Sequence, residues 1–250
     1  MHKASVRFFL SSLAAGSLLT IAAPAMAYDH LLSAYDFLDN AVVNTTGSNC
    51  VIDWTPGAYA GQTLGAGFFT ATISDAQGWA PSDVHAHWGM YCPSSPAYYT
   101  AIGFGNYFIH ITKAVDIQVG DLLVINNTTG IAGTYSGHTV MITALPTVIS
   151  PQVKPFVAGT TQWRLPVTDS TTSPHGCTDT RYNGLSCLPA NFSAGAGEGD
   201  MRIYTDTGTG DLRGYTWSLA SSATSYFDPT VRPYRVGRPD GLMGPAPVIE

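Results

Sequence analysis

The chain has 250 residues, of which 45% are hydrophobic and 11% charged, against roughly 25% charged in an average soluble protein. Disordered chains, coiled coils and nucleic-acid-binding proteins carry far more charge, so these classes are excluded. The 26 glycines and 16 prolines follow no repeat, which excludes collagen-like and solenoid architectures. The length fits one domain, with or without tails.

Residues 1–27 have the pattern of a secretory signal peptide. Lys3 and Arg7 form a basic start, residues 8–23 are largely apolar, and Ala25-Met26-Ala27 is a small-x-small cleavage site. The alternative is an N-terminal membrane anchor, but the apolar run is short for spanning a bilayer. No later segment has the length and apolarity of a membrane span. We therefore expect a secreted protein, periplasmic or extracellular.

Cleavage after Ala27 would leave 223 residues with 9 basic and 17 acidic side chains, a net charge of −8. An acidic secreted domain has no electrostatic reason to bind nucleic acid or anionic lipid. We expect no nucleic-acid partner, no membrane span and no cofactor.

All four cysteines lie in the part expected to be exported, and an even count in an oxidising compartment favours disulfides. Cys177 and Cys187 are ten residues apart across a polar loop, which suits a local disulfide, and Cys50 and Cys92 form the remaining pair. Zinc binding is the weaker interpretation, because no Cys-x-x-Cys or His-x-x-x-His spacing occurs.

Helical patterns dominate the first part of the mature chain. Apolar residues at helical spacing predict an amphipathic helix over residues 30–42, and the run GAGFFTATISDAQ predicts a buried helix over residues 65–77. Residues 51–54 read as extended. Prolines break any long element between residues 80 and 115.

Strand patterns begin after Gly120. Pro166 lies inside one expected strand, which argues for an edge position, and the turn Thr-Gly-Thr-Gly-Asp predicts a hairpin. The expected strands cover residues 121–125, 138–145, 161–169, 201–206, 212–218 and 231–236. Helices followed by antiparallel strands indicate an α+β fold. We expect one domain over residues 28–238 and a loose tail over residues 239–250.

A histidine and a carboxylate lie at the ends of two of these strands. If strands 138–145 and 161–169 pair antiparallel, the start of one lies beside the end of the other, and His138 becomes a neighbour of Asp169. A carboxylate beside an imidazole orients its tautomer and supports its charge, as a general base requires. The alternative is an ordinary histidine at a strand end.

The stretches GDLLVI and SGHTVMI resemble the second half of secreted bacterial cysteine peptidases and amidases of the NlpC-like, CHAP-like, papain-related group. VTDSTTSPHG, TDTR, MRIYTD, GYTWS and VGRP look like one secreted branch of that group, so the resemblance runs from about Tyr35 to Pro239. It implies a papain-like fold, with N-terminal helices packed on an antiparallel sheet, and a Cys-His-polar triad acting on cell-wall peptides. His138 matches the base and Asp169 the orienting residue, with His175 a lesser candidate.

The nucleophile of that group is missing. Its cysteine opens a buried helix in a pattern like Cys-Ala-Ser-Phe-Val-Thr, whereas this chain has Gly65-Ala66-Gly67-Phe68-Phe69-Thr70. Gly65 thus occupies the cysteine position, and glycine cannot form a covalent intermediate. Cys50 is the alternative nucleophile, but its extended, proline-terminated context suits a disulfide better than an activated thiolate.

Two further patterns carry alternative interpretations. Asp83, His85 and His87 alternate, and on a strand they would share one face and could hold a metal; a polar surface strip is the simpler interpretation, and we expect no metal. Tyr215 and Trp217 also alternate and could stack on a sugar or peptide, although packing on a sheet face is commoner.

Two principal functions follow from the sequence. The first is a cysteine hydrolase or amidase scaffold for cell-wall peptides, inactive because its nucleophile is missing. The second is a pseudoenzyme that keeps the cleft to bind a peptide or partner protein. An extracellular structural protein is a further alternative.

Overall fold

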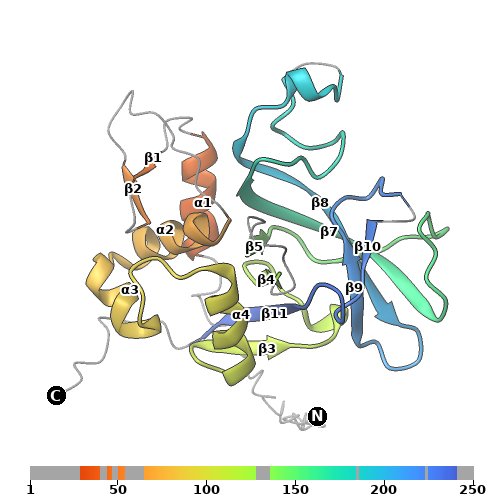
Figure 1. Ribbon diagram of the computed structural model, residues 1–250, viewed down its shortest axis with the longest axis horizontal. Coiled ribbons are helices and arrows are strands. Elements are labelled where there is room, and N and C mark those ends of the chain that lie inside the picture. Colours follow the sequence, from red (N-terminus) through yellow and green to blue (C-terminus); the bar gives the residue numbers. More distant parts are fainter. Residues whose placement is uncertain are drawn as a thin grey trace, which may run out of the picture.

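The computed structural model describes residues 29–39, 44–46, 50–53, 65–127, 136–183, 186–222 and 225–240. Within these residues the helices come first and the strands of the main sheet follow, all of them antiparallel (Figure 1). The predicted α+β class is therefore confirmed. The expected signal peptide and residues 241–250 of the expected tail lie outside the described residues, so the domain boundaries stay predictions.

Four helices form the N-terminal part of the described chain. They are α1 (Asp29–Asp39), α2 (Gly65–Gln77), α3 (Pro81–Trp88) and α4 (Ser95–Phe104). Helix α2 has the bounds that the sequence predicts, and its first ten residues are all buried. Helix α1 is described as far as Asp39, and the rest of the predicted helix, residues 40–42, lies outside the described part. None of the described helices is long and apolar enough to cross a membrane.

The strands form a small hairpin and one large sheet. The hairpin pairs β1 (Asn44–Thr46) with β2 (Val51–Asp53). The large sheet has the order β10-β9-β8-β7-β5-β4-β11-β3, and β6 also pairs with β7. Its strands are β3 (Phe108–Ile111), β4 (Leu122–Asn126), β5 (Gly137–Ile142), β6 (Thr147–Val148), β7 (Thr160–Thr171), β8 (Gly195–Asp206), β9 (Leu212–Thr216), β10 (Tyr226–Phe227) and β11 (Tyr234–Pro239).

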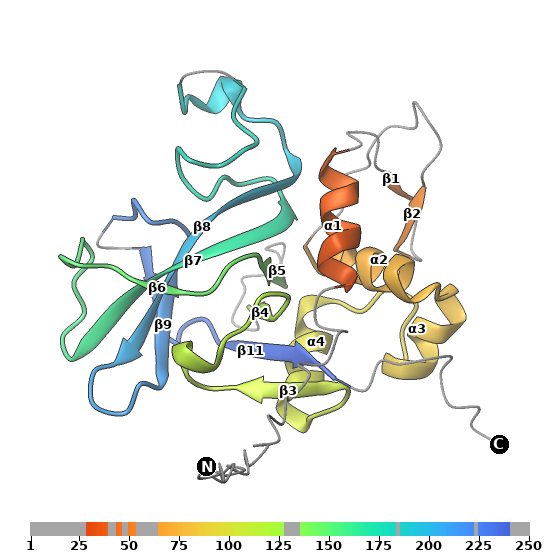
Figure 2. The same ribbon diagram turned by 180° about the vertical axis from the view of Figure 1, so that it is seen from behind.

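Two hydrophobic clusters lie on opposite faces of the central strands. Leu122 and Val124 of β4 join the helices in one cluster, while Leu123 and Ile125 join residues of the other strands in the second. Because successive side chains of a strand point to opposite faces, β4 is buried on both sides, which explains its continuous apolar run. Figures 1 and 2 show the helices gathered on one side and β7, β8 and β9 extending on the other.

The sheet curls back on itself, and this curl encloses the second cluster. Lys113, just after β3, forms an antiparallel bridge with Asp211, just before β9. The Leu212 N–H donates to the Thr112 carbonyl at 2.9 Å, and the Tyr234 hydroxyl donates to the Gly214 carbonyl at 3.4 Å. The segment after β3, at one end of the sheet order, is thus linked to the start of β9, which is next to last at the other end. Apolar residues of β4, β5, β7 and β9 therefore pack against one another.

The predicted edge position of the strand containing Pro166 is wrong. Strand β7 pairs along its full length with β8 and on its other side with β5 and β6. Pro166 lies between these two partners, where its carbonyl accepts the Thr143 N–H at 3.0 Å. An interior strand can therefore contain this proline, because its partner changes at the position where an N–H is missing.

Other strand limits also differ from the predicted ones. Strand β8 begins at Gly195 rather than Met201, β5 ends at Ile142 rather than Leu145, and β11 runs from Tyr234 to Pro239. The early part of β8 contains Gly197 and Gly199, and a Cβ there would lie 2.5 Å from Cγ of Arg181 and 2.6 Å from Cβ of His175. Glycine in this strand thus permits close packing of side chains from a loop.

Candidate functional site at the His138–Asp169 pair

The start of β5 lies beside the end of β7. The two strands pair antiparallel through Met141–Thr168 and Ile142–Val167, and the ladder stops there. His138 is the second residue of β5, and Asp169 is the third residue from the end of β7. The predicted juxtaposition of these two residues is confirmed.

His138 donates from Nε2 to Oδ2 of Asp169 at 2.5 Å. The histidine is 7% exposed and the carboxylate is fully buried. A hydrogen bond on Nε2 fixes the tautomer, so in the neutral ring Nδ1 carries the lone pair. This is the arrangement that orients a general base.

Asp169 has two further partners. Its Oδ2 also accepts Nε2–H of His175 at 3.0 Å, and its Oδ1 accepts an Arg181 N–H at 2.9 Å. Burial alone would raise the pKa of this carboxyl group, but the charge of His175 and the hydrogen bonds from both histidines hold that pKa well below its usual value. Asp169 is therefore ionised in the folded protein.

His175 carries a proton on both ring nitrogens. Its Nδ1 faces the Trp217 carbonyl at 2.8 Å, and its Nε2 faces Asp169. A carbonyl and an ionised carboxylate can only accept, so both nitrogens donate and the ring is an imidazolium. The ring also stacks on Trp217, with the ring centres 4.2 Å apart. His175 thus supplies a positive charge beside Asp169.

Arg181 completes a buried cluster of charges. Its guanidinium donates to both oxygens of Asp179, at 2.8 and 2.7 Å, as well as to Asp169. Two carboxylates are thus balanced by one guanidinium and one imidazolium, all of them buried. Such balance is what permits charge in a protein interior. We call Asp169, His175, Asp179 and Arg181 the buried charge cluster.

Gly65, at the expected nucleophile position, lies against the ring of His138. A Cβ built on Gly65 would lie 2.8 Å from both Nε2 and Cε1 of His138 and would overlap the Thr139 carbonyl oxygen. The backbone oxygen cannot move without displacing β5. The structure therefore leaves no space for any side chain at the first residue of α2.

Both predicted disulfides are present. Cys50 pairs with Cys92, with Cα atoms 5.4 Å apart, and Cys177 pairs with Cys187, with Cα atoms 4.9 Å apart. All four cysteines of the chain are used. The alternative in which Cys50 is the nucleophile is therefore wrong for the oxidised protein, because its sulfur is in a disulfide.

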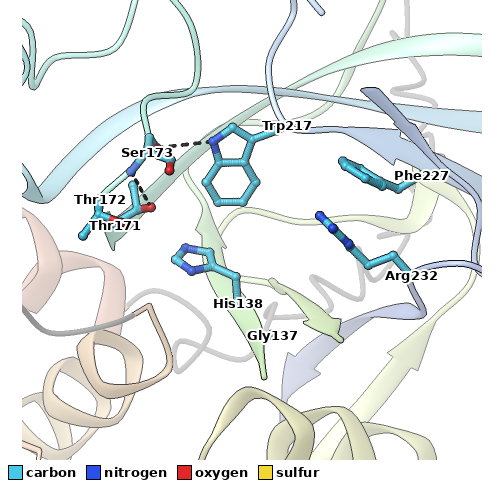
Figure 3. Close-up of a pocket in the computed structure, with 8 residues that line it drawn as sticks. All are labelled: Gly137, His138, Thr171, Thr172, Ser173, Trp217, Phe227 and Arg232. Carbon is cyan, nitrogen blue, oxygen red and sulfur yellow. Dashed lines mark hydrogen bonds between the residues drawn. The ribbon is translucent and has the colours of Figure 1, made fainter. Parts of the chain in front are cut away.

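A pocket of about 280 Å³ opens beside His138. Figure 3 shows His138, Trp217 and Arg232 converging on it from three different segments, with Phe227 beside Arg232. We call this cavity the His138 pocket. Its described lining residues are Gly137, His138, Thr171, Thr172, Ser173, Trp217, Phe227 and Arg232.

The other sequence candidates do not join this site. Asp83, His85 and His87 lie on helix α3, not on a strand, so the alternate spacing does not place them on one face. Asp83 instead accepts the Ala80 N–H at 2.8 Å at the start of that helix. No group of metal-ligating side chains forms among the residues described. Tyr215 is fully buried in the core, whereas Trp217 borders the pocket.

Several residues of the site, among them Asp179, Arg181, Phe227 and Arg232, were not singled out from the sequence. Arg181 follows Asp179 in a loop, and Phe227 and Arg232 come from a segment near the C-terminus. Arg232 directly precedes Pro233, whose carbonyl accepts the Asn126 N–H at the end of β4, and Asn126 pairs with Gly137 of β5. The stretch TDTR contains Asp179 and Arg181, but the spacing of these two residues does not predict the bidentate contact between their side chains.

Fold and site together define an α+β protein with a buried carboxylate–imidazole pair beside a small pocket. The chain is 30% identical over 204 residues to the uncharacterized protein R653 of Acanthamoeba polyphaga mimivirus, a match that covers 77% of this chain and 86% of the viral protein. The chain belongs to the same family as that viral protein. No protein-family model and no solved structure matches it.

Proposed function

We propose that the protein is a secreted relative of the NlpC-like and CHAP-like, papain-related hydrolases that binds a peptide beside His138 without cleaving it through a covalent intermediate. Two features support this relationship: the His138–Asp169 pair, and its position against the first residue of a buried helix. The two disulfides are typical of a protein folded in an oxidising compartment.

The observation that carries the proposal is the absence of space at Gly65. A covalent hydrolase needs a nucleophile within hydrogen-bond reach of its base. Here the Nε2 of His138 is bonded to Asp169, and a Cβ at Gly65 would overlap the Thr139 backbone. Thr70, the next hydroxyl along α2, bonds the Ala66 carbonyl and the Tyr98 hydroxyl in the core.

Binding remains possible because the pocket is retained. A cavity of about 280 Å³ is close to the lower limit of roughly 300 Å³ for small-molecule sites. Aromatic faces, hydroxyls and an imidazole line it, which are the groups that orient a bound polar ligand. The buried charge cluster lies behind His138 and holds its ring in place at the pocket.

The test combines binding and turnover on one sample. The labelled protein is titrated with soluble cell-wall stem peptides while the Trp217 indole signal is followed by NMR, with Trp217→Phe to assign the signal. The same mixtures are analysed by mass spectrometry for cleavage. We expect saturable shifts, no cleavage, and loss of the shifts in His138→Asn, with the exposed His85→Asn as matched control.

Two results would overturn the proposal. Cleavage sensitive to a thiol-alkylating reagent would require a reactive cysteine, against the pairing of all four. Absence of shifts with every peptide would instead favour an extracellular structural protein, in which the buried charge cluster serves stability.

A further inference from the structure

His138 presents a nitrogen lone pair to the His138 pocket. Its Nε2–H is bonded to Asp169 at 2.5 Å, which leaves the lone pair of the neutral ring on Nδ1. No described residue forms a hydrogen bond with Nδ1, yet Nδ1 is not one of the unpartnered polar atoms that are sealed from solvent in the described part. His138 is only 7% exposed and lines the pocket. The accessible surface of Nδ1 therefore opens into that pocket.

Three contacts fix the direction of this lone pair. The hydrogen bond to Asp169 holds the ring on one side, and the Trp217 ring meets it edge-to-face, with the ring centres 5.0 Å apart and the planes at 76°. The backbone of Gly65 lies so close that an added Cβ would be 2.8 Å from Nε2 and Cε1 of the ring. Nδ1 is thus a preorganised acceptor, because a ligand that donates to it does not have to order the ring first.

Two other polar groups of the pocket wall are bonded within it. Nε1–H of Trp217 donates to the Ser173 carbonyl at 3.3 Å, and the Thr171 hydroxyl accepts the Ser173 N–H at 3.1 Å (Figure 3). Thr172 and Ser173 are exposed, so water can satisfy their hydroxyl groups. A ligand therefore gains most from a donor that bonds Nδ1 of the nearly buried His138, because an unmade hydrogen bond costs most at a buried group.

The remaining surface of the pocket favours a small apolar group beside that donor. Trp217 and Phe227 supply aromatic surface. The volume of about 280 Å³ lies below the usual range of roughly 300–1,000 Å³ for small-molecule sites, so only a short part of a peptide enters. A charged ammonium group would lose more hydration than a neutral amide on entering such a space. The pocket therefore favours a neutral N–H next to an apolar side chain.

We propose that Nδ1 of His138 accepts a hydrogen bond from a backbone N–H of the bound peptide, next to an apolar side chain that lies against Trp217 and Phe227. This inference rests on the proposed peptide-binding function and names the group of the peptide that is recognised. The bond from Nε2 to Asp169 keeps the lone pair on Nδ1. No bond of the peptide is broken.

The experiment removes the donor from the ligand. N-acetyl-leucine N-methylamide is compared with two analogues, one with an oxygen in place of the leucine N–H and one that carries an N,N-dimethylamide instead. The Trp217 indole signal reports binding in mildly alkaline buffer, in which histidines are generally neutral. We expect at least one analogue to bind at least about tenfold more weakly, equivalent to about 1.4 kcal/mol. The nitrogen NMR signal of His138 Nδ1 should be that of an unprotonated nitrogen in the free protein and should move when the parent peptide binds.

A variant removes the acceptor instead. His138→Phe keeps an aromatic ring but has no lone pair, so it should weaken binding of the parent peptide to the level of the weaker analogue and leave that analogue unchanged. His85→Phe is the matched control and should preserve the difference, because His85 is exposed on helix α3 and is not among the described lining residues. The ligand comparison and the nitrogen signal use the native protein, so they decide the matter even if His138→Phe does not fold.

The outcomes separate the two proposals. Equal affinity for all three compounds, with an unmoved nitrogen signal, would overturn the acceptor role of His138 while leaving peptide binding in place. Binding of none of them, together with no shift from the stem peptides, would remove the proposed function itself. N-acetylglucosamine tests the ligand class: if it binds as tightly as the parent peptide and moves the same nitrogen signal, the ligand is a sugar and the peptide assignment is overturned.

Discussion

Nε2 of His175 lies 3.0 Å from Oδ2 of Asp169, the same oxygen that accepts His138 at 2.5 Å. His175 is not among the described residues that line the His138 pocket, yet it contributes one of the charges of the buried charge cluster behind that pocket. Because the imidazolium of His175 and the guanidinium of Arg181 balance two carboxylates, Asp169 stays ionised and can orient His138. His175 is therefore a positioning residue rather than a substitute for Asp169.

Replacement of His175 tests this balance. His175→Leu removes one cation from the buried charge cluster, and loss of one partner of a buried ion pair typically costs about 3–5 kcal/mol. We expect a decrease of about 3 kcal/mol in the free energy of unfolding, measured by urea denaturation. His85→Leu, at an exposed position, should stay within about 0.5 kcal/mol. Equal effects of the two substitutions would contradict the assigned charge.

Gly65 gives a second prediction. Gly65→Ala places a methyl group against the His138 ring and the Thr139 carbonyl, and overpacking of this kind costs about 1–3 kcal/mol. Urea denaturation should show that loss, and Gly65→Cys should lose at least as much without gaining hydrolytic activity. Gly208→Ala is the control, because its Cβ would meet only one side-chain atom, Oδ1 of Asp206 at 3.3 Å, and no backbone atom. A fully stable, hydrolytically active Gly65→Cys would contradict the steric argument.

The pairing of His138 with Asp169 could be predicted because it depends on local rules. Apolar patterns define both strands, and antiparallel pairing then places the start of one beside the end of the other. Helix α2 was predictable for a similar reason, since its run of small and apolar residues is continuous.

The features that were not predicted depend on distant contacts. The run from Gly195 to Gly199 reads as a loop, but these glycines let Arg181 and His175 pack against β8. Asp83 and His87 looked like a strand pattern because alternate spacing does not exclude a helix, and Pro81 at the first helical position is compatible with one. Arg232 reaches the pocket because it lies just before β11, which pairs with β4 beside β5.

The disulfides should differ in their contribution to stability. Cross-linking mainly restricts the unfolded chain, so the bond with 42 residues of separation should stabilise by about 4 kcal/mol and the bond with 10 by about 3 kcal/mol. Urea denaturation of the double variants Cys50→Ser/Cys92→Ser and Cys177→Ser/Cys187→Ser measures both. The native protein should show no titratable thiol, since all four cysteines are paired. A larger loss from the second double variant would contradict the loop-length argument.

His30 should make the protein sensitive to mild acid. The side chain is fully buried, its Nε2 donates to the Gly120 carbonyl at 2.7 Å, and its Nδ1 has no hydrogen-bond partner. Burial lowers the pKa of this histidine from 6.5 to about 4, although the Gly120 carbonyl and Asp29 act in the opposite direction. A proton on Nδ1 would put an unpartnered N–H and a charge into the core beside Phe69.

The sign of the effect follows from proton binding. As the pH falls from 6.5 toward 4, the unfolded chain binds a proton at His30 and the folded chain does not, so the free energy of unfolding decreases. The difference between the two pKa values corresponds to about 3 kcal/mol of stability, which is lost as the pH falls from 6.5 to 4. Below pH 4 this loss stays constant. His30→Gln retains a donor for Gly120 but does not titrate. Urea denaturation at pH 7, 5.5 and 4 should therefore show a steeper decline for the native protein than for His30→Gln, and parallel declines would contradict the role of His30.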